Sequence, residues 1–319
     1  MSAGLDARGR NRQRKRVNPR VKYLLASAVL ALVMAGPLRA AVVVSSKLSS
    51  ESAMIGQMIR LLLDAHGIPT IDRMTLGATP VVRKALLAGE IDIYTEYTGN
   101  AGFFFNATSD PAWKDLHQGY ELGARLDYAA NHIVWLAPAN ASNAWALAVR
   151  QDIARDHHLR TMSDFARWVR GGGGVVLACS AEFANAGTLR SLEQTYDFAM
   201  RPDQLIVLAG GETSATIGAA AARTNGINTA MVYGTDGGIV AAQLVLLEDD
   251  RHNQPVYAPV PIAREAIIKA YPQLPALLSP LMHSLDSDTL RRLNARVQID
   301  GESAQTVAAD YLHDRGFLK

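Results

Sequence analysis

The clearest structural signal in the chain is the stretch Ile91-Asp92-Ile93-Tyr94-Thr95-Glu96-Tyr97-Thr98-Gly99-Asn100. Its first four residues alternate apolar with polar or amphipathic side chains, which is the period of a half-buried strand. A polar Glu-Tyr-Thr-Gly turn follows, and a helix-like segment that ends at Gly89 precedes it. This order is typical of an α/β lobe, whose ligands bind at the carboxyl ends of the strands. We therefore expect Tyr97, on the loop, to face a ligand, whereas Tyr94 packs within the strand.

The first 40 residues predict a secretory signal peptide. A basic run from Arg8 to Lys22 precedes the apolar segment Tyr23 to Ala35, and Gly36-Pro37 and then a small residue, Ala40, follow. A membrane anchor is the alternative, but about 13 apolar residues fall short of the roughly 20 that a spanning helix needs. We expect a free protein in an oxidising compartment, the bacterial periplasm, where the single Cys179 cannot form an internal disulfide.

The composition changes once this segment is set aside. The chain has 319 residues and 49% apolar content, enough for two cores. Nine of the 32 Lys and Arg residues, but only one of the 30 Asp and Glu residues, lie in the first 40 positions. The remainder thus holds 23 basic and 29 acidic residues, a net charge of −6. Binding to nucleic acid therefore loses its main support.

A second unit of similar construction follows later in the chain. A strand at 205–209, the turn Gly210-Gly211-Glu212-Thr213, a helix at 215–223 and a strand at 228–232 lead to the loop Tyr233-Gly234-Thr235-Asp236-Gly237. Two such lobes would place Tyr97 and Tyr233 across a cleft. A chance likeness between two ordinary βαβ units is the alternative.

Two segments are suited to cross between the lobes. The first is 138–143, and the second is the proline-stiffened Tyr257-Ala258-Pro259-Val260-Pro261, after which helices return to the first lobe. We therefore expect a signal peptide at 1–40, a first lobe at 41–142 and 258–319, and a second lobe at 143–257.

The sequence offers little for catalysis but several well-placed aromatic rings. No histidine or cysteine spacing that would hold a metal is present, so neither a metal, a cofactor nor an enzyme is expected. Rings lie at strand ends or crossovers at Tyr97, Trp145, Tyr233 and Tyr257, with Phe183 a weaker fifth. Converging aromatic faces suit a quaternary ammonium, which cannot donate an ordinary hydrogen bond, and each ring contributes about 0.5–2 kcal/mol. Each ring could instead pack within its own lobe.

Several motifs resemble those of the substrate-binding proteins of osmoprotectant ABC importers, and within them the low-affinity glycine-betaine-binding subgroup called OsmF or YehZ. They are Ser46-Lys47, Leu76 to Arg83, Gly89 to Gly99, Ala146 to Arg150 and Tyr233 to Gly237, and the likeness covers about 42–319. The resemblance implies a type II periplasmic-binding-protein fold, two α/β lobes joined by a two-strand hinge that close over the ligand. It also implies a quaternary-ammonium ligand and an inner-membrane ABC permease with its ATPase as partner. We expect a monomer.

The resemblance also assigns site residues. Cage aromatics of the family fall on Tyr97, on Trp145 where relatives often have tyrosine, on or beside Tyr233, and on Tyr257. Lys47 matches a lysine near the ligand carboxylate, and Asn100 replaces a threonine.

One departure concerns the carboxylate of a betaine. Many relatives have Glu-Phe-x-x-Arg, whereas this chain reads Glu182-Phe183-Ala184-Asn185-Ala186 and lacks the arginine. A hydrogen bond to a charged group is worth about 1.5–3 kcal/mol, so the loss predicts betaine binding weakened roughly ten- to a hundredfold. Choline would lose little, and Arg190 is a possible substitute.

The sequence thus predicts a periplasmic solute-binding protein that captures glycine betaine, choline or a similar osmoprotectant with low affinity and delivers it to the permease. One alternative keeps the fold but binds another small zwitterion or an amino acid. The other is a ligand-sensing module of a receptor.

Overall fold

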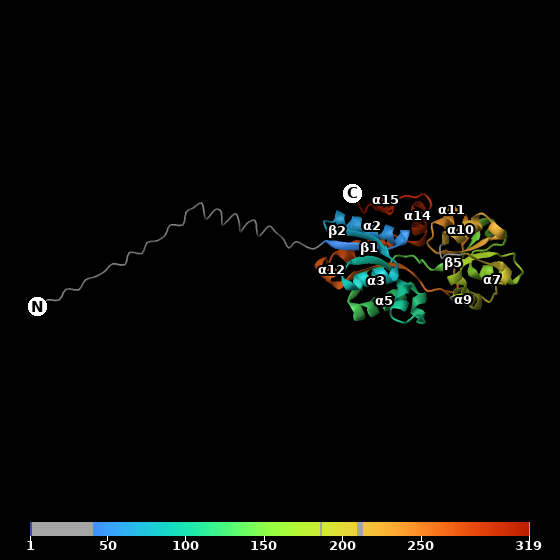
Figure 1. Ribbon diagram of the computed structural model, residues 1–319, viewed down its shortest axis with the longest axis horizontal. Helices are drawn as coiled ribbons and strands as arrows, with labels where there is room; N and C mark the ends of the chain where they lie inside the picture. The colour runs from blue at the N-terminus through green and yellow to red at the C-terminus, as the bar shows by residue number, and fades with distance from the viewer. Residues whose placement is uncertain (2–40, 186, 209–212, 319) are drawn as a thin grey trace. The chain divides into compact units, whose positions relative to one another are not determined.

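Two five-stranded sheets, each with its own helices, form the folded part of the chain (Figure 1). The computed structural model describes Met1 and residues 41–185, 187–208 and 213–318. The expected signal peptide, apart from Met1, and the expected turn at 210–212 lie outside the described residues. Among those that are described, no helix has the length and apolar character to cross a membrane.

The two sheets share one topology. The first has the order β2-β1-β3-β10-β4, formed by Thr70–Gly77, Val42–Lys47, Ile93–Tyr97, Pro259–Arg264 and Ile133–Trp135. The second has the order β7-β6-β8-β5-β9, formed by Leu205–Leu208, Leu177–Ser180, Thr229–Tyr233, Trp145–Arg150 and Leu244–Leu246. In both, the first three strands are parallel, and the fourth is antiparallel to both of its neighbours. The expected α/β fold class with two similar halves is therefore confirmed.

The strand β3 differs from the expected one in its bounds. It begins at Ile93 and includes Tyr97, which the sequence places on a loop. The reason is its pairing with β10, which continues to the last residue as Pro259 opposite Tyr97. The turn starts only afterwards, as a short 3-10 helix at Thr98–Asn100.

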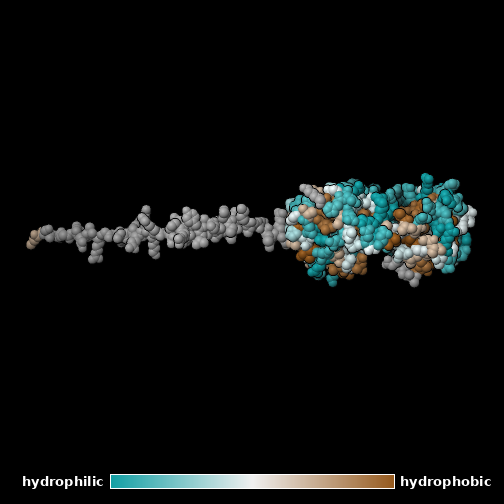
Figure 2. Space-filling model, turned by 90° about the horizontal axis from the view of Figure 1, so that it is seen from above, coloured by the Kyte–Doolittle hydropathy of each residue, from teal (hydrophilic) through white to brown (hydrophobic). Residues whose placement is uncertain are grey.

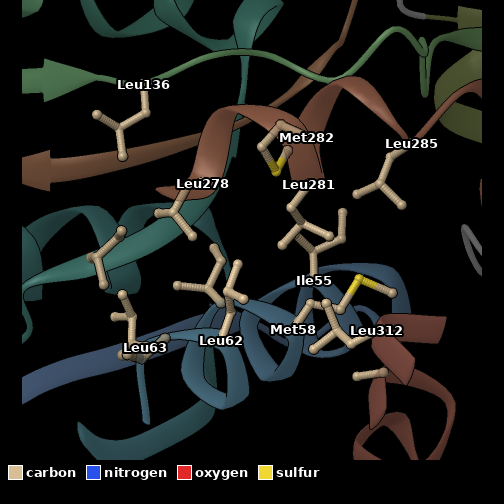
Figure 3. Close-up of a cluster of buried hydrophobic side chains, with 14 of the residues drawn as sticks. Ile55, Met58, Leu62, Leu63, Leu136, Leu278, Leu281, Met282, Leu285 and Leu312 are labelled. Atoms are coloured by element: carbon tan, nitrogen blue, oxygen red, sulfur yellow. The ribbon is translucent and has the colours of Figure 1, made fainter. Parts of the chain in front are cut away.

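The first sheet and the helices packed around it are here called the first lobe. Its helices are α2 (Ser50–Ala65), α3 (Thr79–Ala88), α4 (Ala101–Phe104), α5 (Leu116–Asn131), α12 (Glu265–Ala270), α13 (Leu274–His283), α14 (Ser287–Gln298) and α15 (Ala304–Asp314). Figure 3 shows Ile55, Met58 and Leu62 of α2 meeting Leu281 and Leu312 from the C-terminal helices in one buried cluster. Segments more than 200 positions apart therefore share one apolar core.

The second sheet and its helices form the second lobe. These helices are α6 (Gln151–Asp156), α7 (Met162–Arg170), α8 (Ala181–Asn185), α9 (Thr188–Tyr196), α10 (Thr213–Ala221) and α11 (Gly238–Ala241). Its main core is a separate cluster in which Phe165, Phe183 and Tyr196 are the largest fully buried side chains. On the face shown in Figure 2, apolar patches interrupt a largely hydrophilic surface.

Two segments, 136–144 and 247–258, connect the lobes; the first runs alongside β10 and then meets the end of the second. The Leu136 N–H donates to the Pro261 carbonyl at 2.9 Å, and the Ala139 N–H donates to the Pro259 carbonyl at 2.8 Å. Farther along, the Asn143 N–H donates to the Tyr257 carbonyl at 3.0 Å. The crossing strands are thus tied to each other, as a two-strand hinge requires.

Candidate functional site

A cavity of about 1320 Å³ lies where the two lobes and the crossing segments meet. On the first lobe its walls come from the start of α2, the end of β3, α4 and α14. On the second lobe they come from the start of β5, the helices α8 to α11 and the loop after β8, and both crossing segments contribute between the lobes. The described lining includes Glu51, Tyr97, Asn100, Phe103, Asn143, Trp145, Glu182, Tyr233, Thr235, Asp236, Tyr257, Asn294 and Gln298. Five of the seven expected site residues are among them, and Lys47 and Phe183 are not.

Tyr97 lies at the end of β3 and is almost fully buried, at 7% exposed. Its hydroxyl donates to Glu51 Oε1 at 2.8 Å. Burial, and after it the negative charge of Glu51, raise the pKa of Tyr97 well above its ordinary value, so the phenol stays a donor. The Lys47 ammonium lies over the ring, 4.9 Å from its centroid. One face of Tyr97 is therefore already covered by a cation.

Lys47 does not line the cavity because the buried Glu96 holds it. The two side chains form an ion pair, and Glu96 also accepts the Tyr94 hydroxyl at 2.7 Å and the Asn100 amide at 2.7 Å. Lys47, expected near a ligand carboxylate, is thus paired with Glu96 and lies outside the cavity lining. Asn100 is in the lining as expected, but its amide is used to hold Glu96.

Trp145 and Tyr233 are cross-strand partners in the β5–β8 pairing. Their rings stack with centroids 6.3 Å apart and an angle of 24° between the planes. Phe183 is fully buried and meets Trp145 edge-on, with ring centroids 5.9 Å apart. It supports the Trp145 ring from the core of the second lobe and does not reach the cavity.

Tyr257 lies against the backbone of the Glu-Tyr-Thr-Gly turn. A Cβ added at Gly99 would stand 2.8–3.0 Å from carbons of the Tyr257 ring, so the glycine makes room for it. The Tyr257 N–H donates to Ser142 Oγ on the other crossing segment at 3.1 Å. Burial, with a smaller effect of Tyr233, raises the pKa of Tyr257 above its ordinary value. The first-lobe turn and both crossing segments thus fix this ring.

Glu51 is the site residue that the sequence did not reveal. It has the position of an ordinary first-turn acid of α2, yet it is 2% exposed. Besides the Tyr97 hydroxyl, it accepts Asn143 Nδ2 at 3.0 Å and Asn294 Nδ2 at 2.7 Å. Asn294 also donates to the Thr235 carbonyl of the second lobe at 2.7 Å. No local pattern could have shown that α14, 243 positions away, completes this site.

The electrostatic character of the described lining is acidic. Its charged members are Glu51, Glu182 and Asp236, and it contains neither a lysine nor an arginine. Arg190, the possible substitute for the missing arginine, is exposed on α9 and lies outside this lining. No three His, Cys, Asp or Glu side chains of the described chain are grouped so that they could hold a metal ion.

Some buried polar atoms of the lining have no protein partner among the described residues. They are Trp145 Nε1, Asn143 Oδ1 and Asn294 Oδ1. A buried polar atom without a partner costs about 1–3 kcal/mol, and such atoms call for an explanation. Their gathering around one cavity is in keeping with a site arranged for something other than internal packing.

Comparison with known proteins shows close relatives over nearly the whole folded chain. A glycine betaine-binding protein YehZ of Escherichia coli strain K12 is 46% identical over 304 residues, which is 94% of this chain and all of the relative. A glycine-betaine-binding protein of Pseudomonas aeruginosa is 28% identical, covering 86% of this chain and 88% of the relative. The solved structure of apo YehZ from E. coli superposes with a TM-score of 0.81, covering 87% of this chain and 99% of that one.

Residues 40–314 also match a family described as the substrate binding domain of ABC-type glycine betaine transport systems, OpuAC. The resemblance noted in the motifs is therefore confirmed. The same match confirms the expectation of a binding protein instead of an enzyme. The chain belongs to the OpuAC family of ABC-transporter substrate-binding domains.

Proposed function

We propose that the chain binds a quaternary-ammonium osmoprotectant, such as glycine betaine or choline, in the cavity between its lobes. The observation that carries this is the gathering of Tyr97, Trp145, Tyr233 and Tyr257 on one cavity, although they come from both sheets and a crossing segment. Several aromatic faces around one space attract a cation through the negative face of each ring.

The four rings differ in how much of their surface a ligand can reach. Trp145 and Tyr233 form one stacked pair on the second lobe, and Tyr257 rests on Gly99. We expect Tyr97 to contribute less binding free energy than a ring with both faces open, because Lys47 already covers one of its faces. With about 0.5–2 kcal/mol from each ring, and with the carboxylate-binding arginine absent, we expect weak binding of glycine betaine.

The biological role follows from the family. We propose that the chain works as a monomer in the periplasm after removal of residues 1–40, and that its closed, loaded form delivers the ligand to an inner-membrane ABC permease with its ATPase. The lobes would be 41–142 with 258–319, and 143–257. Family membership supports this role, and so does the similarity to relatives named for glycine betaine binding.

Calorimetric titration of the purified folded chain with glycine betaine, choline, carnitine, proline betaine and ectoine tests the proposal. We expect saturable binding of at least one quaternary ammonium. Trp145→Ala should weaken it about tenfold or more, because one ring and the stacking of Tyr233 are lost, whereas Trp145→Phe should keep most of it. Trp168→Ala, which alters a tryptophan outside the lining, is the matched control. Absence of binding to every ligand would rule out the proposed function.

A further inference from the structure

Glu51 is a buried carboxylate in the cavity wall that has only neutral partners among the described residues. Its oxygens accept from the Tyr97 hydroxyl and from the amides of Asn143 and Asn294. Lys47 stands near the same tyrosine, but its ammonium is paired with Glu96. Both oxygens of Glu51 face donors, which is the arrangement that an ionised carboxylate satisfies, because it can only accept.

A buried charge without an opposite charge is unfavourable, and hydrogen bonds from neutral groups compensate for it only in part. The rest of the described lining does not supply the missing charge, since it adds Glu182 and Asp236 and no lysine or arginine. A cationic ligand would supply it. Glu51 therefore gives the cavity wall a negative charge that a bound cation would balance.

Glu51 is in direct contact with one of the aromatic rings of the cavity, that of Tyr97. Its bond to the Tyr97 hydroxyl sets a full negative charge at the end of that ring. A phenol that donates to an anion keeps more electron density in its ring, which strengthens the attraction of the ring face for a cation. The raised pKa of Tyr97, caused by burial and then by Glu51, agrees with a negative charge at this position.

We infer that Glu51 is a specificity-determining residue, which makes the cavity select quaternary-ammonium ligands of net positive charge over zwitterions that carry a carboxylate. This inference rests on the proposed function. For a choline-like cation the charge of Glu51 is purely attractive. For a betaine, attraction of the ammonium is offset by repulsion of the carboxylate, and the described lining has no cation to receive that carboxylate.

Three ligands of similar size separate charge from shape. They are choline, glycine betaine and 3,3-dimethylbutan-1-ol, the neutral carbon analogue of choline. In competition calorimetry with the folded chain, choline should bind at least about tenfold tighter than either of the others, a difference of about 1.4 kcal/mol. These measurements need no variant.

Glu51→Gln then tests the residue itself. It removes the charge but keeps the size, and the Asn143 amide can turn its unpaired Oδ1 toward the new NH₂ group. The preference for choline over glycine betaine should fall about tenfold. Glu51→Asp keeps the charge and should keep the preference. Glu90→Gln, an equal charge change on the exposed surface, is the control and should leave the preference within about twofold.

The outcomes distinguish the inference from the proposed function. Glycine betaine binding as tightly as choline to the wild type would overturn the inference and leave the proposed function standing. So would an unchanged preference in a folded Glu51→Gln variant, with folding checked by circular dichroism. If Glu51→Gln does not fold, the wild-type comparison of the three ligands decides. Failure of every quaternary ammonium to bind would overturn both.

Discussion

Gly99 determines where the Tyr257 ring can lie. The ring occupies the position that a side chain at residue 99 would take, with carbons 2.8–3.0 Å from a Cβ built there. Gly99→Ala should therefore displace the ring from the cavity wall. We expect quaternary-ammonium affinity to fall about two- to thirtyfold, the worth of one ring. Overpacking should lower the free energy of unfolding by about 1–3 kcal/mol. Calorimetry and urea denaturation measure the two effects.

Gly174→Ala is the matched control, because a Cβ at this exposed glycine would meet nothing within 4 Å. It should change neither affinity nor stability by a measurable amount. An affinity in Gly99→Ala equal to that of the wild type would show that the position of Tyr257 does not matter for binding.

At the scale of single residues, sequence reasoning located backbone positions better than side-chain roles. It placed Tyr97, Trp145, Tyr233 and Tyr257 on what is now seen to be one cavity, since each stands at the end of a strand or on a crossover. The pairing of Lys47 was not predicted. Its partner Glu96 lies 49 positions away, and only the folded first sheet brings the two side chains together.

For Phe183 and Glu51, the sequence did not predict what surrounds the side chain. A ring after a strand can turn toward the cavity or into the core. The Phe183 ring turns into the core, where it packs against Trp145. A first-turn acid normally faces solvent, yet Glu51 is enclosed by side chains from β3, a crossing segment and α14.

Among the secondary-structure elements, the buried carboxylate of Asp127 joins α3, α5 and β4. It accepts Arg83 Nη1 and Nη2 at 2.7 and 2.6 Å, and Trp135 Nε1 at 2.8 Å. Burial alone would lower the pKa of Arg83, but the hydrogen bonds and charge of Asp127 outweigh it and raise that pKa. The pair is therefore a bidentate contact that is almost wholly enclosed by the protein.

Removing one member of this pair should leave the other as an unpaired buried charge. We expect Arg83→Met or Asp127→Leu each to cost about 3–5 kcal/mol of unfolding free energy. The double substitution should cost clearly less than the two together, since it leaves no orphaned charge. Urea denaturation of the wild type and the three variants measures the unfolding free energies of this double-mutant cycle.

The exposed pair Lys269–Glu265 supplies the comparison. Lys269→Met should leave the midpoint of urea denaturation close to that of the wild type, because water screens this pair. An equally small shift of the midpoint for Arg83→Met would mean that burial of the Arg83–Asp127 pair has no energetic consequence.

The elements themselves were more predictable than their contacts. Alternation and turn residues predicted strands close to β3, β7 and β8, because those signals are local. The expected second crossover at 257–261 was partly wrong, because residues from Pro259 onward pair with β3 and β4 as strand β10. The role of α14 was not predictable. Its Asn294 and Arg291 hydrogen-bond the Thr235 and Gly234 carbonyls of the loop after β8, more than 50 positions away. Such contacts depend on how the lobes meet, which no periodicity encodes.

For the molecule as a whole, the size of the cavity is informative. Its volume of about 1320 Å³ exceeds the roughly 300–1,000 Å³ typical of ligand pockets. A cavity of this size leaves room for the lobes to move closer together around a ligand as small as choline. We therefore expect binding through rings of both lobes to bring the lobes closer together.

Small-angle X-ray scattering tests this closure. The radius of gyration of the folded chain should decrease on saturation with choline, because the lobes rotate about the paired crossing segments and the contact of α14 with Gly237. Trp145→Ala at the same choline concentration should keep the radius of the free protein, since it loses the ring that links ligand to the second lobe. An unchanged scattering profile at a concentration that calorimetry shows to be saturating would mean that the ligand binds one lobe alone. The rings of the other lobe would then contribute nothing to affinity.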